Sequence, residues 1–400
     1  MDPTGTADSA TRQLVYGGLI LVLFVLPVVL RRFGVPGAIT SLGLGIIAGF
    51  TDLFDAGSTI AILSTFGIVA LFLSAGLEID LRELRAQGRP LLEYIAAAFV
   101  GVGLLALLGA ELTGLPRRES LLVALVLLIP STGFILDSLR GLGLSDAEAE
   151  RTKTFAIAVE LLGLAGLLVA SQPSVARLAV SVLAILALVG MVPVIMKGFA
   201  SHVVHYAPKT EFAFLLVLGL FCAYITKLLG VYYLVGAFLV GVAARRFRQE
   251  LPALSSDRIL HTTEDFGHLF APFYFFYAGM AIHPQLAEAR WVLFGATLAL
   301  VLLPLRVKGV ELLLRRRMAP GEGDPRRIAL AVLPTLVFSL VLIDFLRGET
   351  DASFGLLDAL TVYTIIATLA PAFFFRRMGA AEKGGVATEE EADPLPHLTP

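Results

Sequence analysis

Long apolar runs alternate with short polar joints along almost the whole chain. Each run is long enough to cross a bilayer as a helix, which takes roughly 20 residues. Isolated strands cannot satisfy their backbone groups in lipid, so the runs are expected to be helices. The pattern predicts about thirteen spans, at residues 13–31, 36–51, 59–77, 90–113, 119–140, 152–171, 174–200, 210–229, 230–246, 264–283, 288–315, 326–347 and 355–376.

The composition agrees with this pattern. The 400 residues are 57% hydrophobic and only 16% charged, with a mean hydropathy of +0.83, which excludes an ordinary soluble domain. We therefore expect an all-α polytopic membrane protein in three parts: residues 1–12 as a short extracytoplasmic N-terminus, 13–377 as the transmembrane transporter domain, and 378–400 as a disordered cytoplasmic tail.

The chain also lacks the signatures of several other classes. The single cysteine, Cys222, excludes an internal disulfide or a metal–thiolate cluster. No phosphate-binding glycine loop, Ser/His/Asp set or cluster of metal-ligand side chains stands out. We therefore expect no enzyme activity, no cofactor, no nucleic-acid partner and no resident metal; an enzyme buried in the membrane is a poor third alternative.

Basic residues gather at alternate joints. Arg31 and Arg32 follow the first run, and arginines or lysines follow the third, fifth, seventh, ninth, eleventh and last runs. Because lysine and arginine favour the cytoplasmic side, we expect a cell (inner) membrane protein with its N-terminus outside and its C-terminus in the cytoplasm. Arg117 and Arg118 are exceptions to the pattern.

One carboxylate interrupts the sixth run. Glu160 has no charged neighbour for several residues on either side. Acids within a span are rare and face a partner or water, so Glu160 marks a candidate functional site. It is interpreted as a carboxylate that alternately binds a proton and a cation. The alternative is a buried acid permanently tied to a lysine.

Three other features lie at a similar distance from the predicted cytoplasmic edge. Glu160 lies about seven residues, roughly 10 Å of helix, from Lys153. The similar features in other runs are Pro130-Ser131-Thr132-Gly133, Lys308 and Pro334-Thr335. We expect Ser131 and Thr132 to bind the ion together with Glu160, and Pro130, Gly133, Pro334 and Thr335 to support broken helices. A simple proline kink is the alternative at each break.

The two proline-containing runs resemble each other. LVLLIPSTGFILDSL and LAVLPTLVFSLVLIDFL are both broken by proline beside hydroxyl residues, seven spans apart and opposite in direction. Paired interrupted spans in the two halves of a transporter point to its substrate site. We therefore predict inverted repeats with two broken, crossing helices.

The motifs also resemble a known family. Four segments are similar to signatures of the monovalent cation:proton antiporters, in their Kef-like and NapA-like branch: RRFGVPGAITSLGLGIIAGF, GIVALFLSAGLEIDLRELR, YYLVGAFLVGVAARR and HLFAPFYFFYAGMAIHP. The resemblance implies the sodium/proton antiporter fold, with a core domain, a dimerisation domain, elevator-like movement and a homodimer. It also implies that Glu160 matches the family's second core acid and that Lys308 matches its late basic residue.

This chain departs from the family at one position. Val159 stands where the family carries a first polar or acidic residue, so one oxygen ligand is missing. Arg306 competes with Lys308 for the basic role; the two lie about 160° apart on a helix, so at most one can face the core. The alternative is that Lys308 extends to the membrane edge, which its long stem permits.

These observations predict a secondary transporter that exchanges protons for a monovalent cation, Na⁺ or K⁺, by alternating access. With one acid and one base in the core, we expect 1:1 electroneutral exchange. Two alternatives stay open: an ion-conducting pathway of the same fold, and a non-transporting membrane sensor that has lost its ion site.

Overall fold

The computed structural model shows a protein built from helices. It describes residues 3–51, 54, 58–79, 82, 88–139, 142–203, 206, 210–229, 234–250, 257–282, 288–318, 322–350 and 353–390, and these contain no strand. The helices are α1 (Pro3–Arg31), α2 (Gly37–Thr51), α3 (Ser58–Glu78), α5 (Gly88–Thr113), α6 (Arg117–Leu128), α7 (Thr132–Leu139), α8 (Asp146–Ser171), α9 (Val175–His202), α10 (Glu211–Leu228), α11 (Leu234–Glu250), α12 (Asp257–Met280), α13 (Ala289–Arg315), α14 (Pro325–Ala331), α15 (Leu336–Glu349) and α16 (Phe354–Glu390).

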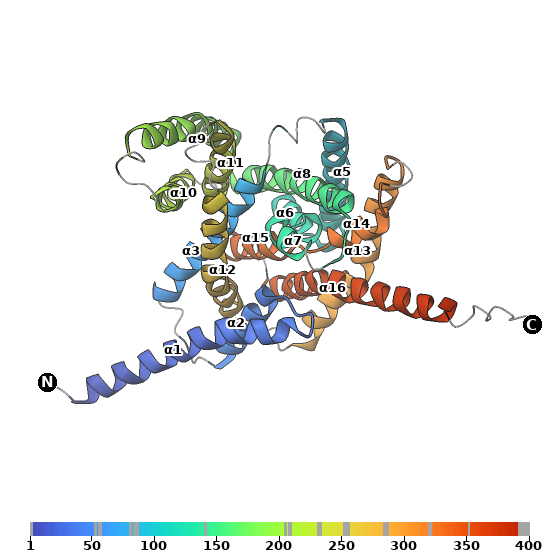
Figure 1. The fold of residues 1–400 in the computed structure, drawn as a ribbon, viewed down its shortest axis with the longest axis horizontal. Coiled ribbons are helices and arrows are strands. Elements are labelled where there is room, and N and C mark those ends of the chain that lie inside the picture. Colours follow the sequence, from blue (N-terminus) through green and yellow to red (C-terminus); the bar gives the residue numbers. More distant parts are fainter. Residues whose placement is uncertain are drawn as a thin grey trace, which may run out of the picture.

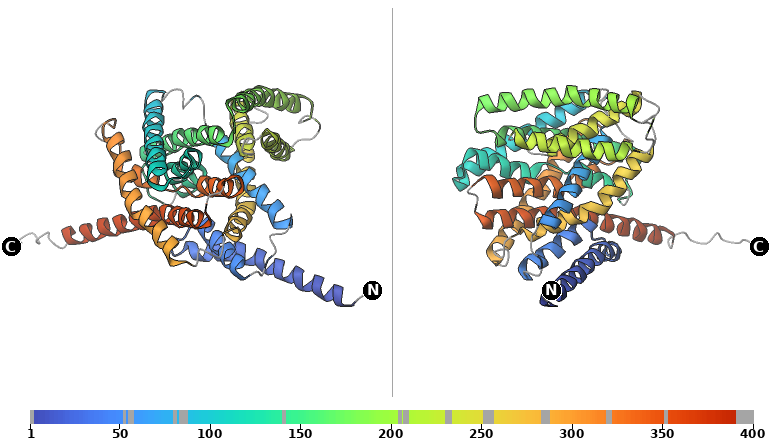
Figure 2. Two further views of the ribbon diagram at one scale, coloured as in Figure 1. Left: turned by 180° about the vertical axis from the view of Figure 1, so that it is seen from behind. Right: turned by 90° about the vertical axis from the view of Figure 1, so that its left-hand side faces the viewer.

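The helices form two groups that lie side by side (Figure 1). In the first, which we call the panel, α3 packs on α11 and α12, α2 on α12, and α10 on α11. In the second, the core bundle, α5 packs on α6 and α8, α13 on α14 and α16, and α15 on α6 and α16. Helix α3 of the panel contacts α7 of the core bundle. A view from the side shows several of the long helices running roughly parallel (Figure 2).

The panel helices cross at glycines. A Cβ atom on Gly45 of α2 would collide with the backbone of α12 near Gly279, and one on Gly76 of α3 with the backbone of α11 near Gly241. Each of these two crossings pairs a helix of the first half of the chain with a helix of the second half, and the contacts of α5 with α6 and α8 recur as those of α13 with α14 and α16. The repeated arrangement is the inverted repeat that the sequence predicts.

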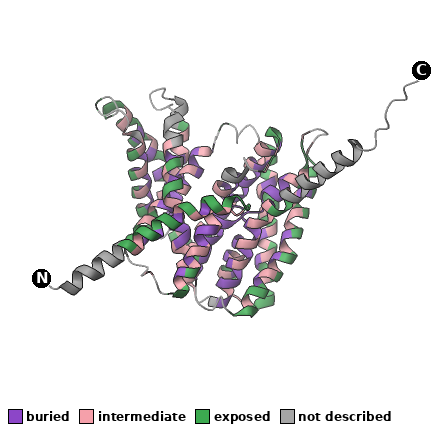
Figure 3. Ribbon diagram, turned by 60° about the horizontal axis from the view of Figure 1, so that its bottom comes forward, coloured by how far each residue is buried: buried purple, intermediate pink, exposed green. Residues whose placement is uncertain are grey.

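Large apolar side chains stay exposed along α1, α5, α9 and α13, whereas α3, α6 and α8 are mostly buried (Figure 3). Among the described residues, eight helices are long and apolar enough to cross a membrane, or nine if the bent pair α14–α15 counts as one span. The multi-pass, all-helical prediction is therefore confirmed, whereas the predicted number of thirteen spans is not.

The ends of the chain stay predictions. Helix α1 begins at Pro3, within the predicted N-terminal segment 1–12, and α16 continues to Glu390, within the predicted tail 378–400. Residues 391–400 lie outside the described residues.

Candidate functional site

Glu160 lies near the middle of α8. It follows the first residue of that helix, Asp146, by 14 residues, or about 21 Å of helix, because α8 begins before the predicted span. The side chain is only 6% exposed, and its neighbours Phe155 to Val159 are also buried. The helix therefore holds a carboxylate deep inside the core bundle.

The fifth predicted span is broken opposite this carboxylate. Helix α6 ends at Leu128 and α7 begins at Thr132. Pro130 has no N–H to continue the helix, and it disfavours the helical conformation of the residue before it. Ile129 is accordingly extended, with φ −77° and ψ 122°, and its N–H donates to Leu125 O.

The twelfth predicted span is broken in the same region. Helix α14 ends at Ala331, α15 begins at Leu336, and the two are bent by 41°. The two breaks meet directly: the Ser131 N–H donates to Pro334 O at 2.9 Å, and the Ser339 hydroxyl donates to Val126 O at 2.8 Å. The interrupted helices thus cross at Ser131 and Pro334.

Glu160 caps one of the helix ends exposed at this crossing. Its Oε2 accepts a hydrogen bond of 3.0 Å from the backbone N–H of Thr132, the first residue of α7. A helix N-terminus carries free N–H groups and a partial positive charge, which favour a carboxylate. The bond orients the carboxylate toward the break.

Two threonine hydroxyls add oxygen atoms at the crossing. The Thr132 hydroxyl lies beside the Glu160 carboxylate but makes no hydrogen bond of normal geometry among the described residues. The Thr335 hydroxyl, at the start of α15, is also buried without a partner in the described part of the chain. Buried polar atoms are nearly always satisfied, so these exceptions require an explanation.

A base and a tyrosine occupy the other exposed helix end. Arg306 of α13 donates to Leu128 O at 3.3 Å and to the Tyr363 hydroxyl at 3.0 Å. Tyr363 of α16 in turn donates to Leu127 O at 2.6 Å. These carbonyls end α6 and carry a partial negative charge, which a guanidinium stabilises.

The structure does not bring Lys308 to this site. The Lys308 side chain is 72% exposed, and its Nζ lies 3.0 Å from Glu311 Oε2 on the same helix. Because α13 turns by about 100° per residue, the rotation that points Arg306 inward points Lys308 outward. Of the two candidate bases, the structure thus places Arg306 and not Lys308 at the broken helix, and the role of a base in the site stays a prediction. Tyr363 was not singled out in the sequence, because it lies in an apolar run with no neighbouring motif.

Val159 lines a cavity of about 220 Å³ between α5, α8 and α13. Arg306 and Pro130 also line it, so it reaches the break of the first interrupted helix. Phe155 and Tyr94 lie toward the ends of α8 and α5 that the sequence predicts to be cytoplasmic. The cavity beside Val159 therefore lies in the half of the core bundle that the sequence predicts to be cytoplasmic.

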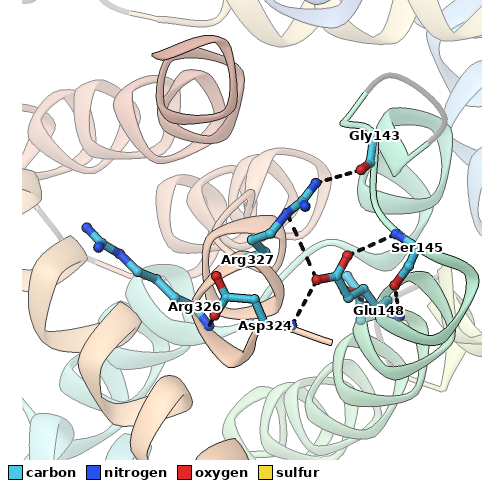
Figure 4. Close-up of polar contacts among 7 residues, drawn as sticks. Gly143, Ser145, Glu148, Asp324, Arg326 and Arg327 are labelled. Atoms are coloured by element: carbon cyan, nitrogen blue, oxygen red, sulfur yellow. Dashed lines mark hydrogen bonds and ion pairs between the residues drawn. The ribbon is translucent and has the colours of Figure 1, made fainter. Parts of the chain in front are cut away.

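A polar cluster fastens the start of α8 to the start of α14 (Figure 4). Glu148 Oε1 accepts from the Asp324 N–H at 2.9 Å, and Glu148 Oε2 from the Ser145 N–H at 2.9 Å, within a capping box. Arg327 donates to Gly143 O at 2.6 Å and lies 4.0 Å from Glu148. The helix that carries Glu160 and one broken helix are therefore joined at one end.

The crossing thus gathers most of the predicted site residues: Pro130, Ser131, Thr132, Pro334, Thr335 and Glu160. Gly133 lies in the first turn of α7. A helix glycine keeps them close together: a Cβ atom on Gly163 of α8 would lie 2.7 Å from Ile129 Cγ2 and 2.8 Å from Phe338 Cζ. Helix α8 therefore touches both interrupted helices.

Comparison with known proteins agrees with this arrangement. The family profile described as "Sodium/hydrogen exchanger, transmembrane" matches residues 19–376. A structure of the sodium proton antiporter MjNhaP1 from Methanocaldococcus jannaschii at pH 8 matches with a TM-score of 0.69 and 16% identity, over 92% of this chain and 97% of that one. An electron-microscopy structure of the same antiporter matches with a TM-score of 0.64 and 15% identity, over 99% and 100% of the two chains. No curated protein sequence matches.

These likenesses confirm the predicted antiporter fold. The Kef-like or NapA-like branch is a finer prediction that they do not test.

Proposed function

This chain belongs to the sodium/hydrogen exchanger family, and from that premise we propose that it exchanges a proton for a monovalent cation at Glu160. The observation that supports this most strongly is the buried Glu160 carboxylate on the N-terminus of α7, at the crossing of two interrupted helices. Intramembrane acids in such positions mark ion pathways and proton relays.

The proposed chemistry rests on one carboxylate that binds either a proton or a cation. When Glu160 is ionised, its free oxygen and the hydroxyls of Thr132 and Thr335 present a set of oxygen atoms, which suits a hard cation. When Glu160 is protonated, the negative charge is lost and the cation leaves. Binding of a proton and of a cation therefore exclude each other.

Arg306 has a different role in this proposal. It holds the carbonyl end of α6 together with Tyr363, across the crossing from the helix end that Glu160 caps. We propose that Arg306 keeps the helix interrupted and compensates the partial negative charge of the α6 carbonyls. It does not take the place of the transported cation.

Transport in proteoliposomes tests the proposal. The purified protein is reconstituted with a trapped pH indicator, and Na⁺ or K⁺ is added outside. We expect cation-dependent proton movement with the native protein, no such movement with Glu160→Gln, and partial activity with Glu160→Asp, which keeps a carboxylate.

Glu111→Gln is the matched control, because Glu111 is an exposed carboxylate at the end of α5. Its loss should leave exchange unchanged. Undiminished exchange by Glu160→Gln would remove Glu160 from the mechanism. Flux above carrier rates would favour a conducting pathway of the same fold, and absence of both flux and cation-dependent thermal stabilisation would favour a sensor.

Three finer points belong to the same proposal. We infer that Na⁺ is carried, since the family is named for it, and include K⁺ as a second candidate cation. The predicted homodimer and the predicted orientation, with the N-terminus outside, are carried forward as part of the proposed transporter.

A further inference from the structure

The cavity of about 220 Å³ beside Val159 reaches the outer surface of the core bundle between α5 and α13. Two of its lining residues, Ala97 of α5 and Gly309 of α13, are exposed. Each lies on a helix face whose large apolar side chains are exposed too. Val100 follows Ala97 by three residues and is 66% exposed, and Leu305 precedes Gly309 by four residues and is 66% exposed. The cavity therefore opens between the two helices toward the lipid.

The lining of this cavity is apolar. Of the described residues that line it, only Arg306 and Tyr94 carry polar side-chain groups, and both already have polar partners. Arg306 donates to Leu128 O and to the Tyr363 hydroxyl, and the Tyr94 hydroxyl lies beside the guanidinium of Arg151. The other lining residues are glycine, alanine, proline and large apolar residues. Apolar cavities of about 150 Å³ stay dry and bind apolar molecules, so this space suits a hydrocarbon chain.

Basic side chains gather where the opening reaches the helix ends that the sequence predicts to be cytoplasmic. Glu93 lies one turn before Ala97 on α5. Its Oε1 accepts from Arg317 Nη2 at 2.5 Å and lies 3.6 Å from Arg89 Nε. Arg317 comes directly after the C-cap of α13, so this ion pair joins the two helices that border the opening. One carboxylate is thus shared by two exposed arginines.

Arg316 adds a charge that no carboxylate offsets. It follows Gly309 by seven residues, about 10 Å, on the same side of α13, and it is exposed. Among the described residues, the ion pairs at this end of α13 do not include it. Glu311, the other carboxylate of these pairs, is buried and shared by Lys308 and Arg315. Cations therefore outnumber carboxylates around the opening, which keeps a net positive charge.

An opening of this kind suits a phospholipid with an anionic headgroup. The headgroup of such a lipid lies at the membrane surface, and its acyl chains extend inward. The exposed arginines and the apolar cavity about 10 Å deeper are placed in the same order. Basic pockets between transmembrane helices on the cytoplasmic side are typical sites for anionic headgroups. The small residues Ala97 and Gly309 leave room for a chain to enter.

We propose that this cavity binds one acyl chain of an anionic phospholipid whose phosphate lies between Arg89 and Arg316. The chain then packs against Pro130 and Val159, so the lipid supports the first interrupted helix from outside the protein. This lipid site goes beyond ion exchange and does not depend on it.

Native mass spectrometry of lipid binding tests the proposal. The purified, delipidated protein in detergent is titrated with phosphatidylglycerol, or with phosphatidylcholine that carries the same acyl chains. We expect phosphatidylglycerol to bind about ten-fold more tightly, a change that one or two basic residues near an anionic headgroup account for. Glycerol 3-phosphate has the anionic group without the chains, and it should not displace the lipid.

The headgroup contact is tested by the double variant Arg89→Gln/Arg316→Gln. Glu93 keeps its other arginine partner in this variant, so the link between α5 and α13 remains. The preference for phosphatidylglycerol should disappear. Arg31→Gln/Arg32→Gln is the matched control, because it removes two exposed arginines at another joint that is predicted to be cytoplasmic. An equal loss in both double variants, or no preference in the native protein, would overturn the proposal.

The acyl-chain contact is tested by Gly309→Leu. A Cβ atom at Gly309 meets no atom within 4 Å, so a leucine fits there and fills the opening. We expect phosphatidylglycerol to bind about ten-fold more weakly, as for two methylene groups kept out of the cavity. Gly190→Leu on α9 is the control, because Gly190 is also exposed and has the same free space.

Ala97→Leu fills the opening from the opposite helix and keeps the test decisive if Gly309→Leu folds poorly. Lipid binding that neither cavity variant weakens would contradict an acyl chain in the cavity. Displacement of the lipid by glycerol 3-phosphate would mean that the arginines bind a free phosphate, and it would overturn the proposal as well.

Discussion

At the scale of single residues, the site depends on which side chain reaches which helix end. Glu160 bonds the first N–H of α7, while Arg306 and Tyr363 bond the last carbonyls of α6. Acid and base are thus placed on helix ends of opposite partial charge, which stabilises both. Neither bonds the other, so the proposed function leaves the acid available to a proton or a cation.

Arg306→Ala tests this division of roles. The change leaves Leu128 O without its guanidinium donor, and an unsatisfied buried acceptor costs about 1–3 kcal/mol of stability. Thermal unfolding in detergent should show the loss, and exchange in proteoliposomes should fall with it. Lys308→Ala, two residues along the same helix, is the control; Lys308 is 72% exposed and Arg315 still pairs with Glu311 without it, so we expect a loss of about 0–1 kcal/mol. Equal effects of the two variants would mean that the position of Arg306 at the break is unimportant.

At the scale of elements, the two interrupted helices and α8 are packed as one unit. Gly163 lies three residues after Glu160, on the side of α8 that faces Ile129 in one break and Phe338 in the other. Proline accounts for the interruption of each helix, but the close approach of a third helix is what aligns both interruptions with the carboxylate. A glycine at this contact permits that approach.

Gly163→Ala should therefore disturb the site without changing any polar group. The added Cβ would lie within 3 Å of both Ile129 and Phe338, and overpacking of this kind costs about 1–3 kcal/mol. We expect a lower unfolding temperature and slower exchange. Gly103→Ala on α5 is the control, because a Cβ there meets no atom within 4 Å and removal of glycine favours a helix. A Gly163→Ala protein as stable and active as the control would argue against tight packing at the crossing.

At the scale of the whole molecule, one cavity lies within the core bundle and another lies between the core bundle and the panel. The smaller one reaches Pro130 between α5, α8 and α13, and the larger one ends at Leu340 between panel and core bundle. The polar cluster around Glu148 joins α8 to α14 at one end of the core bundle. This link agrees with the elevator-like movement that the family resemblance implies, which stays a prediction.

One carboxylate at the crossing predicts the charge moved in each cycle. Val159 supplies no second acid beside Glu160, so under the proposed mechanism we expect one proton to exchange for one monovalent cation, with no net charge crossing the membrane. Protein adsorbed on a solid-supported membrane should therefore give no sustained current when Na⁺ is applied, although proton movement is seen in the dye assay. A sustained current that disappears in Glu160→Gln would contradict 1:1 exchange.

Much of this protein can be read from the order of its residues. Apolar runs longer than a bilayer is thick require helices, since no other open backbone is satisfied in lipid. Pro130 and Pro334 predict the two interruptions because proline lacks an N–H, and Glu160 is conspicuous because a carboxylate in such a run is expensive.

The remaining features depend on how helices turn and pack against one another. Helix α13 is apolar on most of its surface, so hydropathy does not reveal that Arg306 rather than Lys308 faces inward. Asp344 and Arg347 read as the polar end of a span until five helices enclose a cavity around them. Side-chain direction and enclosure are properties of contacts between distant segments, and a one-dimensional pattern does not contain them.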